Sequence, residues 1–237
     1  MRRARSSRLF PPRKRRASPL RLLRRALYWL LMILGALLLY NTLLPPISTL
    51  MMARVVTLRP VTREFVPLAR ISPTLIRAVI AAEDGRFCDH RGVDWQAMQG
   101  AVAEVIDLDS DRSHGASTLT MQTVKNLFLW HHFAYLRKPV EIPLALALDW
   151  VWSKRRIMQT YLNTAEFGPG IFGAEAAARH YFGISAAALS PWQSALLAAA
   201  LPNPTRRNPA SPSGYMRSYA ESISTRVNRG VASACVR

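Results

Sequence analysis

One long apolar run constrains this chain more than any other feature. No charged or strongly polar side chain occurs from Ala26 to Tyr40, and the run reaches 19 residues if it is continued to Leu44. As a helix it would be about 28 Å long, close to the ~30 Å hydrocarbon thickness of a bilayer. Pro45 and Pro46 end it. We therefore predict a transmembrane helix over residues 26–44, between a basic tail, 1–25, and a linker, 45–64.

The basic charge lies mostly before this run. Of the formal net charge of +18, 11 basic side chains and no acidic one fall in residues 1–25, which leaves +7 for the rest of the chain. A nucleic-acid-binding arm is the competing interpretation, but the apolar run favours a membrane, and we expect no nucleic acid as a partner. An arginine-rich flank stays cytoplasmic, so residues after Pro46 are predicted to lie on the other side. No Ala-x-Ala cleavage site follows, which indicates an uncleaved anchor.

The cysteines and histidines give little direction. Two cysteines, Cys88 and Cys235, are too few for a disulfide scaffold, and their spacing leaves open whether they pair. None of the five histidines shows a metal-binding spacing such as His-Glu-x-x-His.

Residues 83–94, EDGRFCDHRGVD, follow a predicted helix that starts with Ser72 as N-cap and Pro73 as first residue. Ile76, Val79, Ile80 and Glu83 share one face of it, so Glu83 is a carboxylate on an apolar stripe in the last turn. Desolvation and the helix dipole both raise the pKa of such a group, which suits general acid/base chemistry. The alternative is a solvated Glu83-Asp84 pair at a frayed helix end.

Residues 115–126, GASTLTMQTVKN, predict a second helix with Ser117 as its cap. Thr118, Gln122 and Lys125 would share a polar face, opposite an apolar face made by Met121, Val124 and Phe128. Free N–H groups at a helix start and a nearby lysine favour anions, so this helix is a candidate phosphate cradle. An ordinary amphipathic helix is the alternative.

Residues 137–141, RKPVE, open another helix, on which Glu141 shares a face with Leu144, Ala145 and Leu148. A structural ion pair between Lys138 and Glu141 is the simpler interpretation of this carboxylate. Pro143 is unexplained by helix chemistry, and it is expected to bend the chain near the site.

The remaining chain predicts mainly helices. Residues 47–71 read as a linker with a short strand at 55–58, and Asp94 as the N-cap of a helix with a core-facing stripe of Trp95, Met98, Val102 and Val105. A polar loop follows at 107–115. Further expected elements are a helix capped by Ser153, a glycine-rich turn at 168–173, a small-residue helix at 173–183, a Ser190 capping box before a buried helix, and a last helix at 215–227.

Together the stretches 83–94, 115–126, 137–141, 153–163 and 173–183 resemble, in order, the five signatures of the peptidoglycan glycosyltransferases (glycosyltransferase family 51), the transglycosylase module of bifunctional penicillin-binding proteins. Two positions depart from the second signature: Ala116 stands for a glycine, and Met121 for the first of two paired glutamines. The resemblance implies a mainly α, lysozyme-like transglycosylase domain over residues 65–230, followed by a tail, 231–237. Since no Ser-x-x-Lys with room for an acyl-transfer domain follows, we expect a monofunctional enzyme without transpeptidase activity.

Under this resemblance the substrate is lipid II, polymerised into β-1,4-linked glycan at the inner membrane of a Gram-negative bacterium, with the catalytic domain in the periplasm and cell-wall synthesis proteins as candidate partners. Glu83 would be the general base of an inverting transfer, and Glu141 a second catalytic carboxylate that orients cations or holds a divalent ion, Mg²⁺ or Mn²⁺. No cofactor is certain. The implied substrate-binding residues are Asp84, Phe87, Ser117, Thr118, Gln122, Lys125, Asn126, Arg137 and Lys138.

Two other functions stay open at this point. A lytic muramidase would share the fold and a catalytic glutamate, although groups that hold a diphosphate would then serve no purpose. A catalytically inactive membrane scaffold is the second alternative, for which Met121 is the only indication.

Overall fold

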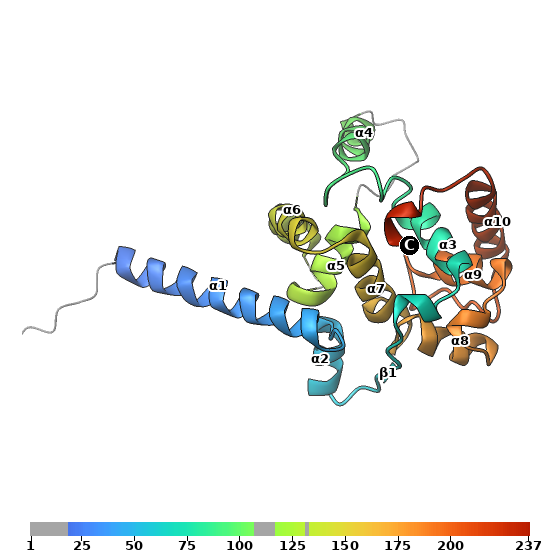
Figure 1. The fold of residues 1–237 in the computed structure, drawn as a ribbon, viewed down its shortest axis with the longest axis horizontal. Coiled ribbons are helices and arrows are strands. Elements are labelled where there is room, and N and C mark those ends of the chain that lie inside the picture. The colour runs from blue at the N-terminus through green and yellow to red at the C-terminus, as the bar shows by residue number, and fades with distance from the viewer. Residues whose placement is uncertain (1–18, 107–116, 131–132) are drawn as a thin grey trace, which may run out of the picture. The chain divides into compact units, whose positions relative to one another are not determined.

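The computed structural model describes residues 19–106, 117–130 and 133–237 of the chain (Figure 1). Most of the basic tail and the predicted polar loop at 107–115 therefore lie outside the described residues. The chain divides into two compact units, residues 1–40 and 41–237, which are described separately.

The first unit holds most of helix α1, Pro19–Leu43. It is the one helix of the described chain that is long and apolar enough to cross a membrane. It covers residues 26–43 of the predicted 26–44 and starts seven residues before Ala26, since the basic segment Pro19 to Arg25 is helical too.

The second unit begins with a helix where a strand was expected. Helix α2, Thr49–Val56, is capped by the Ser48 hydroxyl, which accepts a hydrogen bond from the backbone N–H of Met51. The predicted strand at 55–58 is therefore wrong. The Ser48 cap and the strong helix formers from Leu50 to Ala53 favour a helix, and they outweigh the strand preference of the short β-branched pair Val55-Val56. A strand does follow, β1, Thr62–Arg63.

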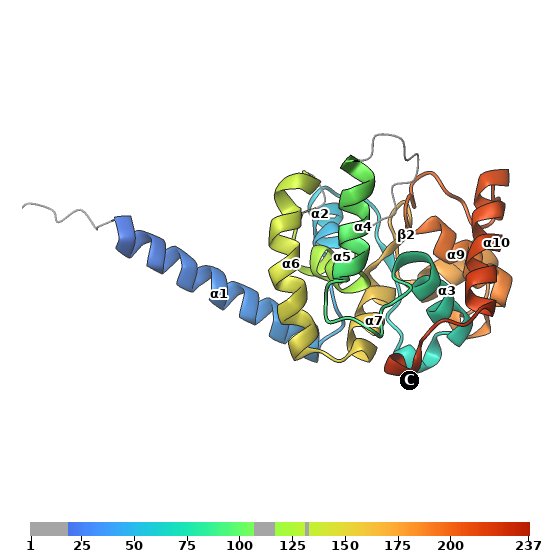
Figure 2. The same ribbon diagram turned by 90° about the horizontal axis from the view of Figure 1, so that it is seen from above.

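Three helices make one half of the core. Helix α3, Pro73–Glu83, packs against α9, Pro191–Ala200, which in turn packs against α10, Gly214–Asn228 (Figure 2). The predicted caps are confirmed: Ser72 caps α3 with Pro73 first, and Ser190 and Gln193 form a capping box at α9. The small side chains of α9 are buried, which permits close helix packing.

The other half is built from α5, Leu119–Phe128, which packs against both α6, Ala134–Val151, and α7, Lys154–Thr164 (Figures 1 and 2). Ser153 caps α7, as predicted. The cap of α5, however, is Thr118 and not Ser117, since the Thr118 hydroxyl accepts the N–H of Met121. Helix α6 runs through Pro139 and Pro143 without ending.

Helix α4, Trp95–Ile106, starts at Asp94, whose carboxylate accepts the N–H of Ala97 as predicted. The predicted core-facing stripe is wrong at its first member, because Trp95 is 52% exposed. Apolar spacing predicts a face but not a partner to cover it. The side chains of Val102 and Val105 lie outside the described part of the chain.

A small sheet of order β1-β3-β2 packs against α9, and the predicted glycine-rich turn connects β2, Glu166–Gly168, to β3, Ile171–Phe172. Helix α8, Ala174–Phe182, follows. Three short 3-10 helices complete the unit: η1, Leu68–Arg70, η2, Ala186–Ala188, and η3, Ala234–Val236.

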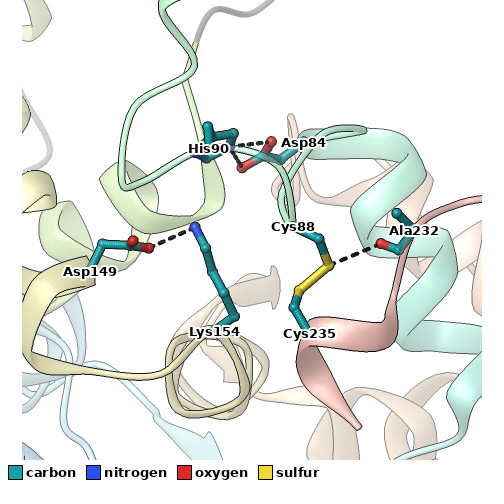
Figure 3. The surroundings of a disulfide bond; sticks show 7 residues. All are labelled: Asp84, Cys88, His90, Asp149, Lys154, Ala232 and Cys235. Atoms are coloured by element: carbon teal, nitrogen blue, oxygen red, sulfur yellow. Dashed lines mark hydrogen bonds and ion pairs between the residues drawn. A yellow bond between two sulfur atoms is a disulfide. The ribbon is translucent and has the colours of Figure 1, made fainter.

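The two cysteines are bonded to each other. Cys88, in the segment after α3, and Cys235, in η3, form a disulfide that closes a sequence separation of 147 residues (Figure 3). It fixes the C-terminal segment beside the stretch 83–94.

Candidate active site

The site centres on Glu83, the last residue of α3. Its Oε2 accepts a hydrogen bond of 2.7 Å from Nε2 of Gln122, on α5. Its other oxygen, Oε1, is buried and has no hydrogen-bond partner among the described residues. One oxygen of this carboxylate is thus held by the protein, and the other is available to receive a proton.

Burial raises the pKa of Glu83, and the nearby Asp84 adds to this. The hydrogen bond from Gln122 and the positive charges of Lys125 and Arg207 act in the opposite direction but do not cancel it. The pKa of a carboxylate in this setting is closer to neutrality than usual, which makes it a better general base. The predicted direction of the shift is confirmed.

The start of α5 is held in place by the residues next to Glu83. Asp84 accepts hydrogen bonds from Nε2 of His90, at 2.9 Å, and from the backbone N–H of Leu119, at 2.9 Å. Thr118 donates to the carbonyl of Gly92 at 2.6 Å. Gly92 has φ +75°, and a Cβ there would lie 2.6 Å from the carbonyl oxygen of Ala145, so only glycine fits.

Positive charge lies near Gln122, beginning with Lys125 on the same helix. Burial, and after it the charge of Arg137, lowers the pKa of Lys125, while Glu141 and Glu83 raise it. Arg137 is ion-paired with Glu141, which is 1% exposed, and Lys138 lies 3.6 Å from the same carboxylate. Among the described residues Lys125 makes no ion pair within 4 Å, so its charge is left for a ligand.

Two cavities meet these groups. One, of about 200 Å³, is lined by Gln122, Lys125 and Asn126 together with Tyr161 and Glu166. The other, of about 340 Å³, is lined by Glu83, Asp84 and Ser117 together with Arg86 and Arg226. The hydrogen bond between Glu83 and Gln122 joins the two, so an acid/base group and a cation serve neighbouring spaces.

Comparison with known proteins gives this arrangement its family. Residues 51–229 match the sequence profile described as Transglycosylase. The chain belongs to this family. It is 51% identical over 184 residues, 78% of its length and 77% of the relative's, to a biosynthetic peptidoglycan transglycosylase of Rhizobium meliloti (strain 1021). Relatives of the same name are 54% identical in Agrobacterium fabrum (76% and 79% of the two chains) and 52% identical in Brucella suis biovar 1 (81% and 85%).

This confirms three predictions: the family, the mainly helical transglycosylase fold and the enzyme class, a glycosyltransferase. Membership also weighs against a muramidase, since these relatives are named as biosynthetic enzymes.

Several residues that were predicted to bind substrate have structural contacts in this transglycosylase. Asp84 (Figure 3) and Thr118 hold the start of α5. Phe87 is fully buried, and Nζ of Lys154 (Figure 3) lies 4.6 Å from the centre of its ring. Their roles toward substrate stay predictions. Met121 is also fully buried and lines neither of the two cavities, so this departure from the signature changes the core and not the site.

Sequence reasoning missed three groups near Glu83. Tyr161 was recognised only as part of the fourth signature, although its hydroxyl contacts Gln122 at 3.1 Å. Arg207 and Arg226 carried no motif. Arg207 follows a proline-rich turn, where a charge near the site cannot be read from spacing.

The predicted divalent cation at Glu141 does not fit the residues present. Mg²⁺ and Mn²⁺ bind sets of oxygen ligands, whereas the Glu141 carboxylate is paired with the two cations Arg137 and Lys138. The described residues also contain no group of three or more acidic, histidine or cysteine side chains suited to a metal. In this transglycosylase Glu141 instead makes ion pairs with Arg137 and Lys138.

Proposed function

We propose that this chain polymerises lipid II into β-1,4-linked glycan strands and releases undecaprenyl diphosphate. The observation that carries the proposal is the Glu83 carboxylate: its Oε1 is buried, its Oε2 is held by Gln122, and Lys125, on the same helix as Gln122, has no ion-pair partner among the described residues. The names of the relatives support the same substrate class.

In the proposed step, Oε1 of Glu83 takes the proton of the 4-hydroxyl of the acceptor sugar. The hydroxyl oxygen attacks the anomeric carbon of the growing chain, and the bond from that carbon to the diphosphate oxygen breaks. Attack from the side opposite the leaving group inverts the configuration and gives a β linkage. A carboxylate whose pKa is raised by burial is suited to this proton transfer.

The leaving group needs positive charge and no strong acid, because its developing charge is spread over phosphate oxygens. Lys125 is the principal cation for it. Arg137 and Lys138 extend the positive region, and Glu141 holds both in place. Ser117, Gln122 and Asn126 supply hydrogen bonds at the walls of the two cavities.

We further propose that α1 anchors the chain in the inner membrane, with the N-terminus in the cytoplasm and the catalytic unit in the periplasm. The arginines before the apolar run favour this orientation. The disulfide between Cys88 and Cys235 supports it independently, because such bonds persist in oxidising compartments such as the periplasm.

The test is to incubate the full chain in detergent with lipid II and, separately, with finished glycan strands. Polymer from lipid II, absent with Glu83→Gln, supports the proposal. Fragments from finished strands would indicate a muramidase, and no product in either reaction from a folded sample would indicate an inactive scaffold.

A further inference from the structure

Tyr161, on α7, is buried among the residues behind the site and is only 1% exposed. Its hydroxyl lies 3.1 Å from Oε1 of Gln122, and Nε2 of the same amide lies 2.7 Å from Glu83. Three side chains from three helices therefore form one chain of hydrogen bonds that ends on the carboxylate.

The chemistry of the groups fixes the direction of this chain. An ionised carboxylate only accepts hydrogen bonds, so the amide nitrogen of Gln122 must face Glu83. The amide oxygen then faces Tyr161, whose hydroxyl must donate. Burial and the charge of Glu83 keep the pKa of Tyr161 well above its ordinary value, so the hydroxyl retains its proton.

The same direction disfavours a protonated Glu83. A carboxyl protonated on Oε2 would have to donate toward Gln122. A carboxyl protonated on Oε1 would keep the bond from the amide only as a weaker, uncharged acceptor, and its own O–H would have no partner among the described residues. The first option needs the amide to turn over, and Tyr161 would then lose its acceptor, since an amide nitrogen cannot accept.

We propose that Tyr161 is a positioning residue: its hydroxyl fixes the orientation of the Gln122 amide, and this orientation holds Glu83 in the ionised form that accepts a proton. The inference rests on the proposed function of Glu83 as general base. Other charged groups also lie near Glu83. The charges of Asp84, Lys125 and Arg207 shift its pKa, and Arg86 and Arg226 line the same cavity. Among the described contacts, none of these charged groups is hydrogen-bonded to the Gln122 amide. Tyr161→Phe therefore changes the hold on the amide and leaves these charges as they are.

The first experiment measures lipid II polymerisation by the full chain as a function of pH. Tyr161→Phe removes only the hydroxyl and frees the amide to turn, so the acidic limb of turnover is expected to move up by about one pH unit. Tyr181→Phe is the matched control, because its hydroxyl donates to the carbonyl of Phe167 and not to the site. Its limb should stay in place.

A purely structural role would lower the amount of active enzyme without moving the limb, so an unmoved limb in folded Tyr161→Phe would overturn the proposal. Gln122→Met should move the limb in the same direction, and adding Tyr161→Phe to it should move it no further. A further shift in the double variant would also overturn it. If Tyr161→Phe does not fold, an unmoved limb in folded Gln122→Met still overturns the proposal, because the amide would then not set the titration of Glu83.

The second experiment needs no activity. The pH dependence of thermal unfolding is compared in pairs with and without Glu83→Gln, so that the difference reports the titration of Glu83. The pH range over which this difference changes should extend to higher pH in Tyr161→Phe than in the original chain. An unchanged pH range would contradict the inference. If the original chain makes no polymer at any pH, the proposed function fails while this measurement still decides the role of Tyr161.

Discussion

The carboxylate of Asp84 accepts a hydrogen bond of 2.9 Å from the backbone N–H of Leu119, the first residue of α5, 35 positions along the chain. The end of α3 and the start of α5 are thereby joined, and with them Glu83 and the helix that carries Gln122 and Lys125. His90 completes the pair as a second donor to Asp84.

Replacing Asp84 with alanine should destabilise the protein by about 3 kcal/mol, since it leaves the N–H of Leu119 and the ring of His90 buried without their partner. Urea unfolding measures the change. Asp89→Ala is the control, because Asp89 is exposed and should change the free energy of unfolding by less than about 0.5 kcal/mol. Equal effects of the two variants would contradict the structural role of Asp84.

Glu83→Gln should abolish polymerisation and raise the melting temperature at neutral pH. The folded state raises the pKa of Glu83, so the stability that this group contributes is fully present below its unfolded pKa and is lost as pH rises through the folded value. At pH 7 the amide avoids the cost of a buried charge. Scanning calorimetry at pH 7 and pH 4 tests this, with exposed Glu221→Gln as control. The assignment is refuted if folded Glu83→Gln polymerises lipid II at the original rate.

Turnover should fall on the acidic side with a midpoint above the ordinary glutamate pKa of about 4.3. The reason is that the base must be ionised and that burial raises its pKa. Initial rates of polymerisation from pH 4 to pH 8, at saturating lipid II, give the midpoint. A midpoint at or below the ordinary value would remove Glu83 as the group that limits the rate.

Lys125→Met keeps the length of the side chain but removes its charge, and it should lower turnover by about 100-fold or more. The loss is expected because no other described cation near the site is free of an acidic partner, apart from Arg207 and Arg226, which lie on the side of α9 and α10. Arg229→Met on the exposed end of α10 is the control. Unchanged turnover and unchanged KM would remove Lys125 from the diphosphate site.

Replacing Cys88 and Cys235 together with serine should destabilise the catalytic unit by about 2–5 kcal/mol, because the unfolded chain regains the freedom of a very long loop. Thermal unfolding with and without a reductant is the measurement. The original chain should lose stability on reduction and the double variant should not. Insensitivity of the original chain to a reductant that demonstrably cleaves the bond would contradict this.

The helices and their caps followed from local chemistry. Ser72, Asp94, Ser153 and Ser190 each begin a helix as predicted, because a cap depends on residues within one turn. The raised pKa of Glu83 could also be anticipated, since the apolar stripe that buries it lies on its own helix.

What the sequence did not reveal depends on contacts between distant segments. Thr118 and not Ser117 caps α5 because the Thr118 hydroxyl is also held by the carbonyl of Gly92, 26 positions earlier. The exposure of Trp95, the pairing of the cysteines and the contact of Tyr161 with Gln122 likewise depend on which elements meet in space. Helical spacing shows that residues share a face but does not identify what lies opposite.

The sulfur–sulfur bond also determines what a protease can do to this molecule. Cys88 and Cys235 bracket a stretch that includes Gln122, Lys125 and Tyr161. A single cut anywhere within that stretch would leave the two fragments covalently attached. They would migrate as one species until a thiol is added, so nicked enzyme outside the cytoplasm would keep both of its pieces.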